Sequence, residues 1–240
     1  PYMVGTNGGG IFVLFYLIFL AIMGVPIMSM ELSIGRASRK STVRAYQELE
    51  KPGTKWHLHG YVAMAGNYIL MMFYTVVTGW MIYYFYLFLT GKFDGASTEQ
   101  VVASYEQMLG SPGILTVTML IVVISGFFIC SFGLQSGVER VTKWMMVALL
   151  VIMVFLAFYS FTMPGAAEGL KFYLVPDMKQ VKEIGLLNII TAAMNQSFFT
   201  LSLGIGAMLI FGSYLGEGRT ILGEAKNIAV LDTFVAIVSG

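Results

Sequence analysis

Two carboxylates interrupt the long apolar stretches of this 240-residue chain, and they are the first candidates for chemistry. Asp232 stands between Leu231 and Thr233, and Glu31 directly follows a block without charge. Ionisable groups at membrane depth are costly, so each is a candidate functional residue. Carboxylate, hydroxyl and carbonyl oxygens suit a hard cation. The residue types therefore suggest ion binding rather than bond breaking.

Each carboxylate has a second interpretation. Glu31 could form an ion pair with Arg36 or Arg39, or it could accept N–H groups where a neighbouring helix unwinds. Asp232 could make a hydrogen bond between helices or act as a cation ligand. An intramembrane enzyme is disfavoured, because the apolar stretches contain no histidine and Cys130 is the only cysteine.

A polar, glycine-rich run occupies residues 195–206, in the middle of the uncharged stretch 184–216. Lipid has no water to satisfy backbone N–H and C=O groups, so a broken helix at this depth must line a cavity enclosed by protein. Gly204 and Gly206 permit the non-helical backbone angles of such a break. A broken helix that faces a cavity is typical of a transporter.

The elements that position these residues are predicted to be membrane-spanning helices. Apolar residues make up 57% of the chain and charged residues 11%, against roughly 25% charged in soluble domains. Five blocks without Asp, Glu, Lys or Arg reach the ~20 residues that cross a bilayer, at 11–30, 60–91, 107–138, 144–167 and 184–216. We predict an all-α membrane protein with five complete spanning helices. A sixth helix is expected to start near Lys226, and its residues 227–240 are too few to cross.

Charged residues indicate the orientation, because basic residues concentrate in cytoplasmic loops. If the blocks alternate in direction, ten of the 14 Lys and Arg residues lie on the side of the loop 31–59. That loop is predicted to be cytoplasmic. The net charge of +1 is a sum over loops. The sequence has no basic stripe with interleaved aromatic residues, so nucleic acid is not an expected partner.

Several motifs together resemble the neurotransmitter:sodium symporter family. They are Asn-Gly-Gly-Gly at 7–10, Gly-Val-Pro at 24–26, Glu31 with Gly-Arg at 35–36, and Phe-Phe-Thr-Leu-Ser-Leu-Gly-Ile-Gly at 198–206. Residues 137–140 and 169–177 are also similar to family segments, and the matches keep the family's order over nearly the whole chain. The bacterial amino-acid transporter branch is the most similar.

The resemblance implies an inverted-repeat (5+5) sodium symporter fold in which helices 1 and 6 are unwound near the middle of the membrane. By this comparison, residues 1–240 form a single transmembrane domain. We expect the chain to be a fragment that covers the outer half of helix 1 through part of helix 7. Residues 1–10 would be the end of helix 1.

The resemblance also implies the roles of individual residues. Tyr74 matches a tyrosine that binds the substrate carboxylate, and Phe199 matches an aromatic residue that closes over the substrate. Thr200 and Asp232 match ligands of the first sodium site, and Thr200 also borders the substrate. The carbonyl of Ser202 would contact the substrate amine, Leu70 and Ile205 would line the side-chain pocket, and Glu31 and Gln196 would support the site. Ordinary packing is the alternative for the apolar and aromatic members, and a hydroxyl bonded to its own helix is the alternative for Thr200.

Chloride is predicted not to be required. Asp232 stands where family members usually have Asn, and Ala236 stands where chloride-dependent members have Ser. Tyr16 and Gln196 match other chloride-site positions, but that serine hydroxyl is missing. Our hypothesis is that Asp232 supplies the negative charge that chloride would otherwise bring.

The expected function is sodium-coupled import of hydrophobic or aromatic L-amino acids by alternating access. Ile205 leaves room for a large side chain, and the matched pocket positions hold no carboxylate for a monoamine. The short loop 92–110 has no cysteine pair, which favours a multi-pass protein of the bacterial inner membrane. Sodium, an amino acid and the lipid bilayer are the expected partners. The first alternative is sodium-coupled transport of another small amine or amino-acid-like solute. A seven-helix signalling receptor is a second, less favoured alternative.

Overall fold

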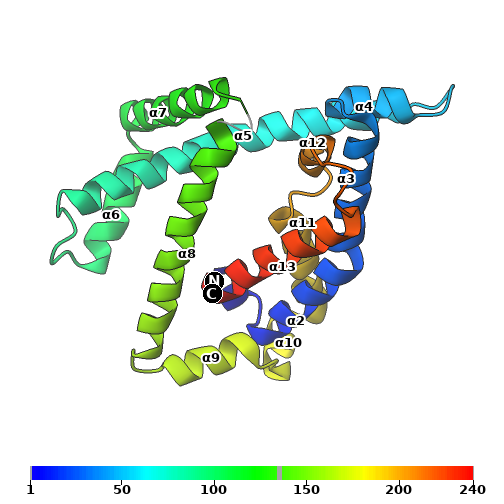
Figure 1. Ribbon diagram of the computed structural model, residues 1–240. Coiled ribbons are helices and arrows are strands. Elements are labelled where there is room, and N and C mark those ends of the chain that lie inside the picture. The colour runs from blue at the N-terminus through cyan, green and yellow to red at the C-terminus, as the bar shows by residue number, and fades with distance from the viewer. Residues whose placement is uncertain (1, 134–136, 240) are drawn as a thin grey trace. The chain divides into compact units, whose positions relative to one another are not determined.

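The computed structural model describes residues 2–133 and 137–239, and within them helices are the only regular elements (Figure 1). The predicted all-α class is confirmed. In chain order the elements are α1 (Tyr2–Thr6), α2 (Gly10–Phe19), the π-helix η1 (Leu20–Gly24), α3 (Val25–Ser38), α4 (Thr42–Leu49), α5 (His57–Leu89), α6 (Thr98–Leu109), α7 (Pro112–Ser131), α8 (Glu139–Phe161), α9 (Ala166–Leu174), α10 (Met178–Ile184), α11 (Leu186–Thr200), α12 (Ala207–Ser213) and α13 (Ile221–Ser239).

The chain forms two compact units. The first comprises Pro1–Gly66 and Ala148–Gly240, and the second comprises Asn67–Val147. The helices α5 and α8 each have residues in both units. The prediction of one transmembrane domain over residues 1–240 stays a prediction.

Among the described residues, four helical stretches are long and apolar enough to cross a membrane. They are Gly10–Ser38, His57–Leu89, Pro112–Ser131 and Glu139–Phe161. The first joins α2, η1 and α3 into 29 helical residues, so it extends beyond the predicted block 11–30. These four stretches correspond to the first four predicted blocks.

The fifth predicted block is broken. Its first part is α11, which ends at Thr200, and its second part is α12, which begins at Ala207. Turns occupy residues 201–206 between them. The predicted interruption of this helix is therefore confirmed, and we refer to residues 201–206 as the unwound segment.

The start of the last helix was predicted incorrectly. We expected it near Lys226, but α13 begins at Ile221. Glu224 lies in the first turn, where the partial positive charge of a helix N-terminus favours a carboxylate, and it also pairs with Arg219 at 2.9 Å. The charged residues that suggested a loop are thus part of the helix.

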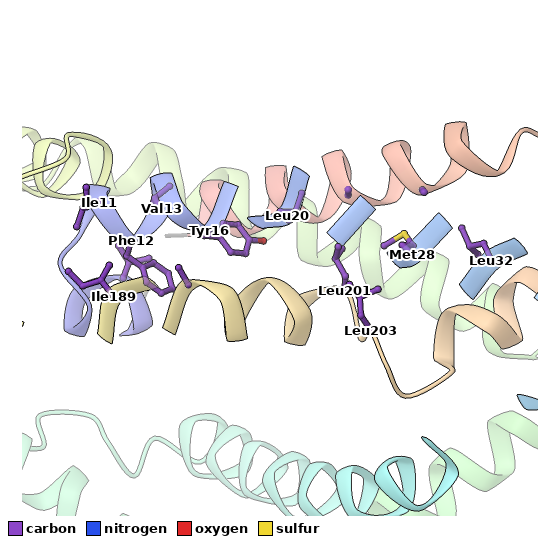
Figure 2. Close-up of a cluster of buried hydrophobic side chains, with 14 residues drawn as sticks. Ile11, Phe12, Val13, Tyr16, Leu20, Met28, Leu32, Ile189, Leu201 and Leu203 are labelled. Atoms are coloured by element: carbon purple, nitrogen blue, oxygen red, sulfur yellow. The ribbon is translucent and has the colours of Figure 1, made fainter. Parts of the chain in front are cut away.

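The core of the first unit lies where α2, η1 and α3 pack against α11, α12 and α13 (Figure 2). Phe12 and Ile189 are buried at one end of this core, and Met28 and Leu32 are buried toward the other end, on α3. In lipid this association depends on close van der Waals packing rather than on exclusion of water. The most extensive contact is that of α3 with α12.

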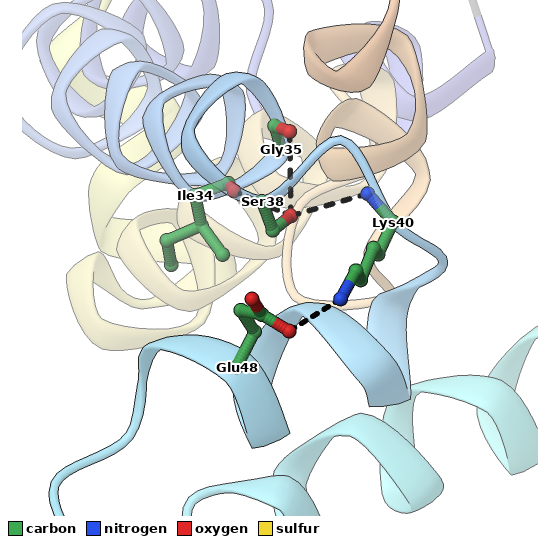
Figure 3. A network of polar contacts seen from close by, with 5 residues as sticks. All are labelled: Ile34, Gly35, Ser38, Lys40 and Glu48. Atoms are coloured by element: carbon green, nitrogen blue, oxygen red, sulfur yellow. Dashed lines mark hydrogen bonds and ion pairs between the residues drawn. The ribbon is translucent and has the colours of Figure 1, made fainter.

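A short helix follows α3 almost directly. Arg39 has a left-handed backbone with φ 50°, and Lys40 N donates to Ser38 Oγ at 3.4 Å (Figure 3). The Lys40 ammonium also pairs with the carboxylate of Glu48, which lies on α4. These contacts attach α4 to the end of α3.

The connection from α4 to α5 is held by Glu50 and His57. Glu50 Oε1 lies 2.7 Å from His57 Nδ1, and Glu50 Oε2 accepts from His57 N at 3.1 Å. Desolvation raises the pKa of Glu50, but the hydrogen bonds from the His57 ring and backbone outweigh it and hold that pKa below its ordinary value.

The second unit is built mainly from α5, α6 and α7. Trp80 and Tyr105 form an edge-to-face pair with ring centroids 5.9 Å apart. A β-carbon on Gly79 would lie 2.9 Å from Thr118 Oγ1, so α5 approaches α7 closely at this glycine. Leu70 and Tyr74 belong to this unit.

Candidate functional site

The unwound segment has the backbone geometry of a helix break. Positive φ angles occur at Ser202 (51°), Gly204 (85°) and Gly206 (73°). Serine rarely adopts a positive φ, so surrounding contacts must hold that conformation. The last helical bonds run from Ser202 N to Phe199 O and from Leu203 N to Phe198 O, both at 3.1 Å. Beyond them the backbone leaves the helix path over residues 201–206.

The outer end of the unwound segment packs on the π-helix. Leu201 is only 2% exposed, and a β-carbon on Gly24 would lie 2.9 Å from Leu201 Cδ1. A side chain at position 24 would require the leucine side chain to shift. The π-helix η1 thus provides the surface that receives the first residue of the break, and π-helical turns are frequent near functional sites.

Glu31 holds the middle of the unwound segment. Its Oε1 atom accepts a hydrogen bond from Gly204 N at 2.7 Å, and the residue is 7% exposed. A charged acceptor gives one of the stronger kinds of hydrogen bond to a freed backbone donor. The sequence allowed this arrangement or an ion pair with Arg36 or Arg39. In the structure Arg36 donates to Arg219 O at 2.7 Å, and Arg39 pairs with Glu217 at 3.5 Å.

Thr200 and Asp232 meet at the end of α11. Thr200 Oγ1 donates to Asp232 Oδ2 at 2.7 Å, which joins residues 32 positions apart in the sequence. Both residues are half-buried. A hydroxyl and a carboxylate at this distance provide oxygen ligands of the kind that a hard cation prefers. No group of three His, Cys, Asp or Glu residues that could hold a metal occurs among the described residues.

Tyr16 brings a second hydroxyl to the same place. Its hydroxyl lies beside those of Thr200 and Thr233 and within electrostatic range of Asp232. The geometry is not that of a hydrogen bond, and among the described residues the buried Tyr16 hydroxyl has no partner. Thr233 Oγ1 is likewise buried without one. Buried polar atoms are normally satisfied, so their accumulation around one carboxylate is typical of a binding site.

The remaining predicted residues differ in their exposure and in the unit to which they belong. Phe199 is 55% exposed, whereas Ser202, Ile205 and Gln196 are half-buried. The Ile205 side chain lies toward α5, because a β-carbon on Gly66 would be 3.8 Å from Ile205 Cγ2. Leu70 and Tyr74 belong to the second unit, and their roles in a pocket with the unwound segment stay predictions.

A cavity of about 880 Å³ lies apart from these residues, between α8, α9 and the end of α13. Its wall is mainly apolar, with Phe161, Leu170 and Phe234 among its residues, and none of the predicted site residues lines it. A binding site needs a few convergent polar groups to orient a ligand. The unwound segment, which has such groups, is therefore the better candidate.

Comparison with known proteins gives consistent results. A family model described as the sodium:neurotransmitter symporter family matches residues 1–108 and 96–240. An uncharacterised sodium-dependent transporter of Bacillus subtilis, YhdH, is 32% identical over all of this chain and 52% of its own length. A sodium-dependent serotonin transporter of Drosophila melanogaster is 27% identical over all of this chain and 43% of its own length.

A solved structure, that of MhsT in complex with L-phenylalanine, matches with a TM-score of 0.88 and 36% sequence identity. The matched region covers 99% of this chain and 53% of the MhsT chain. The chain thus spans about half the length of the relatives that it matches. The predicted fold is confirmed, and the chain corresponds to part of that fold.

Proposed function

Since this chain belongs to the sodium:neurotransmitter symporter family, we propose that it takes part in sodium-coupled import of hydrophobic or aromatic L-amino acids. The observation that carries the proposal is the pairing of Thr200 with Asp232 beside the unwound segment. The sodium dependence named for YhdH supports the choice of ion. Alternating access across a bacterial inner membrane, with several spanning helices, is part of the same proposal.

Sodium would bind between Thr200 Oγ1 and Asp232, together with carbonyl oxygens of the unwound segment. The hydrogen bond that now joins the two side chains would give way to the ion. The carboxylate of the substrate would then lie next to the sodium, so that each ligand favours the state that holds the other. Sodium entry releases roughly 2.3 kcal/mol per charge per 100 mV, and this coupling lets it drive accumulation.

The substrate would be held by residues at the break and by two residues of α5. Tyr74 would bind the carboxylate, and the Ser202 carbonyl and Phe199 would contact the amine. Leu70 and Ile205 would line an apolar pocket, with Gln196 as a supporting residue. The bound L-phenylalanine named for MhsT supports an aromatic or large aliphatic side chain. A related amine or amino-acid-like solute is the second candidate.

Chloride would not be required. Asp232 already places a negative charge beside the Tyr16 and Thr200 hydroxyls, which is the charge that a chloride ion would otherwise contribute. The neighbouring turn of α13 has Ala236, which offers no hydroxyl to an anion. The site thus has a built-in counter-charge for sodium.

Uptake by the full-length protein in liposomes tests the proposal. Labelled phenylalanine, leucine, tyrosine and a monoamine would be supplied with sodium replaced by potassium, and separately with chloride replaced by gluconate. We expect uptake of the amino acids that requires sodium and persists in gluconate. Uptake of the monoamine alone would favour the second candidate. Accumulation without sodium would refute the proposal, and a ligand response without flux would favour a receptor.

A further inference from the structure

Gly206 marks the junction between the unwound segment and the inner half-helix α12. Its φ of 73° makes any side chain there strained. A β-carbon on Gly206 would also lie 2.6 Å from Thr42 Cγ2 and 2.9 Å from Thr42 Oγ1. Thr42 therefore occupies the space that a side chain at Gly206 would need, and it sets how far this junction can move toward α4.

The helix α4 also packs closely on the start of α5. A β-carbon on Gly60, near the start of α5, would lie 2.8 Å from Val43 Cα. Tyr46 makes an edge-to-face contact with His59, with ring centroids 5.2 Å apart. Ala45 is completely buried. The short helix α4 thus contacts both Gly206, which directly precedes α12, and the first turns of α5, all within the first unit.

The position of α4 is also fixed along the chain. The Ser38 hydroxyl and the Lys40–Glu48 ion pair attach it to α3 (Figure 3). The same α3 holds Gly204 through Glu31. One continuous stretch of chain, from η1 to α4, therefore contacts the unwound segment at its beginning, middle and end. Of the three contacted residues, Gly206 lies farthest along the chain from Thr200.

We propose that Thr42 is a positioning residue for the transport cycle, which holds the inner end of the unwound segment so that the Ser202 carbonyl and Ile205 face the substrate. The inference rests on the proposed function for what these residues bind. Thr42 touches neither substrate nor sodium and acts through Gly206. Loss of its side chain allows the segment to sample orientations that bind substrate poorly.

A double-mutant cycle in the full-length protein tests the contact. Gly206→Ala suffers from the positive φ and from a clash with Thr42, and Thr42→Ala removes only the clash. The KM of the double variant should therefore be roughly three- to tenfold lower than the value expected if the two single effects were independent. Gly204→Ala is the matched control, because Gly204 has a φ of 85° but no atom within 4 Å of a β-carbon built there. Thr42→Ala and Gly204→Ala should be additive.

A second measurement does not depend on the substrate. Hydrogen–deuterium exchange of the peptide covering residues 201–213 should rise several-fold in Thr42→Ala at equal thermal stability. Thr42→Val keeps the shape of the side chain, so it should retain wild-type exchange and wild-type KM. An increase in kcat with unchanged KM and exchange would contradict positioning of the binding residues.

The outcomes separate the two proposals. If labelled amino acids are taken up but both cycles are additive and exchange is unchanged, Thr42 has no positioning role and the inference is wrong. If the wild type takes up no amino acid while exchange still depends on Thr42, the proposed function fails and the contact stands. If Thr42→Val behaves like Thr42→Ala, shape is not what matters and the inference is also wrong.

Discussion

At the scale of single residues, the proposed ion binding depends on Asp232, whose carboxylate lies 2.7 Å from the Thr200 hydroxyl on α11. An unpaired charge at this depth is costly, and a bound cation compensates it. Glu31 is buried too, but its charge is directed at a backbone N–H rather than at a side chain. The two carboxylates thus have different partners, one suited to an ion and one to the protein backbone.

Replacement of Asp232 by Asn tests whether its charge takes the place of chloride. The amide oxygen can still accept from Thr200, so the fold should persist. We expect sodium activation of uptake to weaken about 10- to 100-fold in gluconate and to recover partly when chloride is added. Asp94→Asn, a substitution in an exposed loop of the second unit, is the control. Chloride-stimulated uptake in the wild type, together with an unaffected variant, would contradict the role of Asp232.

Replacement of Glu31 tests the hold on the unwound segment. Glu31→Ala leaves the Gly204 N–H without its acceptor, which should cost about 1–3 kcal/mol of stability. Glu31→Gln keeps a neutral acceptor and should cost less, on the order of 1 kcal/mol. Thermal unfolding of the purified protein measures both. Glu217→Ala is the control, because that side chain is 91% exposed and pairs only loosely with Arg39. Equal losses of stability in the Ala and Gln variants would show that the charge of Glu31, and not a hydrogen-bond acceptor as such, stabilises the unwound segment.

At the scale of elements, the pairing of α3 with α12 determines where the inner half-helix lies. A β-carbon on Gly35 would be 2.0 Å from Leu209 O, and one on Gly212 would be 2.5 Å from Leu32 O. Each helix therefore presents a glycine to the backbone of the other. Small residues of this kind let helices approach closely in lipid. The seven-residue helix α12 is too short to be stable alone and depends on this contact.

Alanine substitutions at this interface should separate α3 from α12. Gly35→Ala and Gly212→Ala each place a methyl group against a backbone carbonyl, so we expect a loss of about 1–3 kcal/mol from overpacking. Gly126→Ala is the matched control, since Gly126 lies within α7 and has open space around its β-carbon position. There the better helix propensity of alanine should leave stability unchanged or raise it by up to about 1 kcal/mol. The thermal stability and the uptake activity of the three variants are compared. Equal effects at the three glycines would refute close packing as the cause.

At the scale of the whole molecule, the candidate residues are divided between the two compact units. The ion-site pair, Glu31 and the unwound segment belong to the first, whereas Leu70 and Tyr74 belong to the second. Leu70 and Tyr74, which we propose for substrate binding, thus lie in a different unit from the proposed sodium pair. The chain spans about half the length of its relatives, so transport is proposed for the full-length protein.

Much of this architecture could be predicted from the sequence because lipid restricts what a chain can do. Uncharged blocks of 20 or more residues must form helices in a bilayer, and hydroxyls and glycines at 200–206 within such a block mark a break. The start of α13 was predicted incorrectly because charge within a first helical turn looks like a loop in the sequence. Resemblance to a family added the roles of residues that composition alone could not distinguish.

Tertiary structure alone decided which groups meet. Glu31 and Gly204 are 173 positions apart, and nothing local distinguishes an acceptor for that N–H from a partner for Arg36. The contact of Thr42 with Gly206 had no signal in the sequence, since a threonine in a basic loop is unremarkable. The physical reason is that hydropathy and backbone propensity act along the chain, whereas close contacts depend on how helices pack in three dimensions.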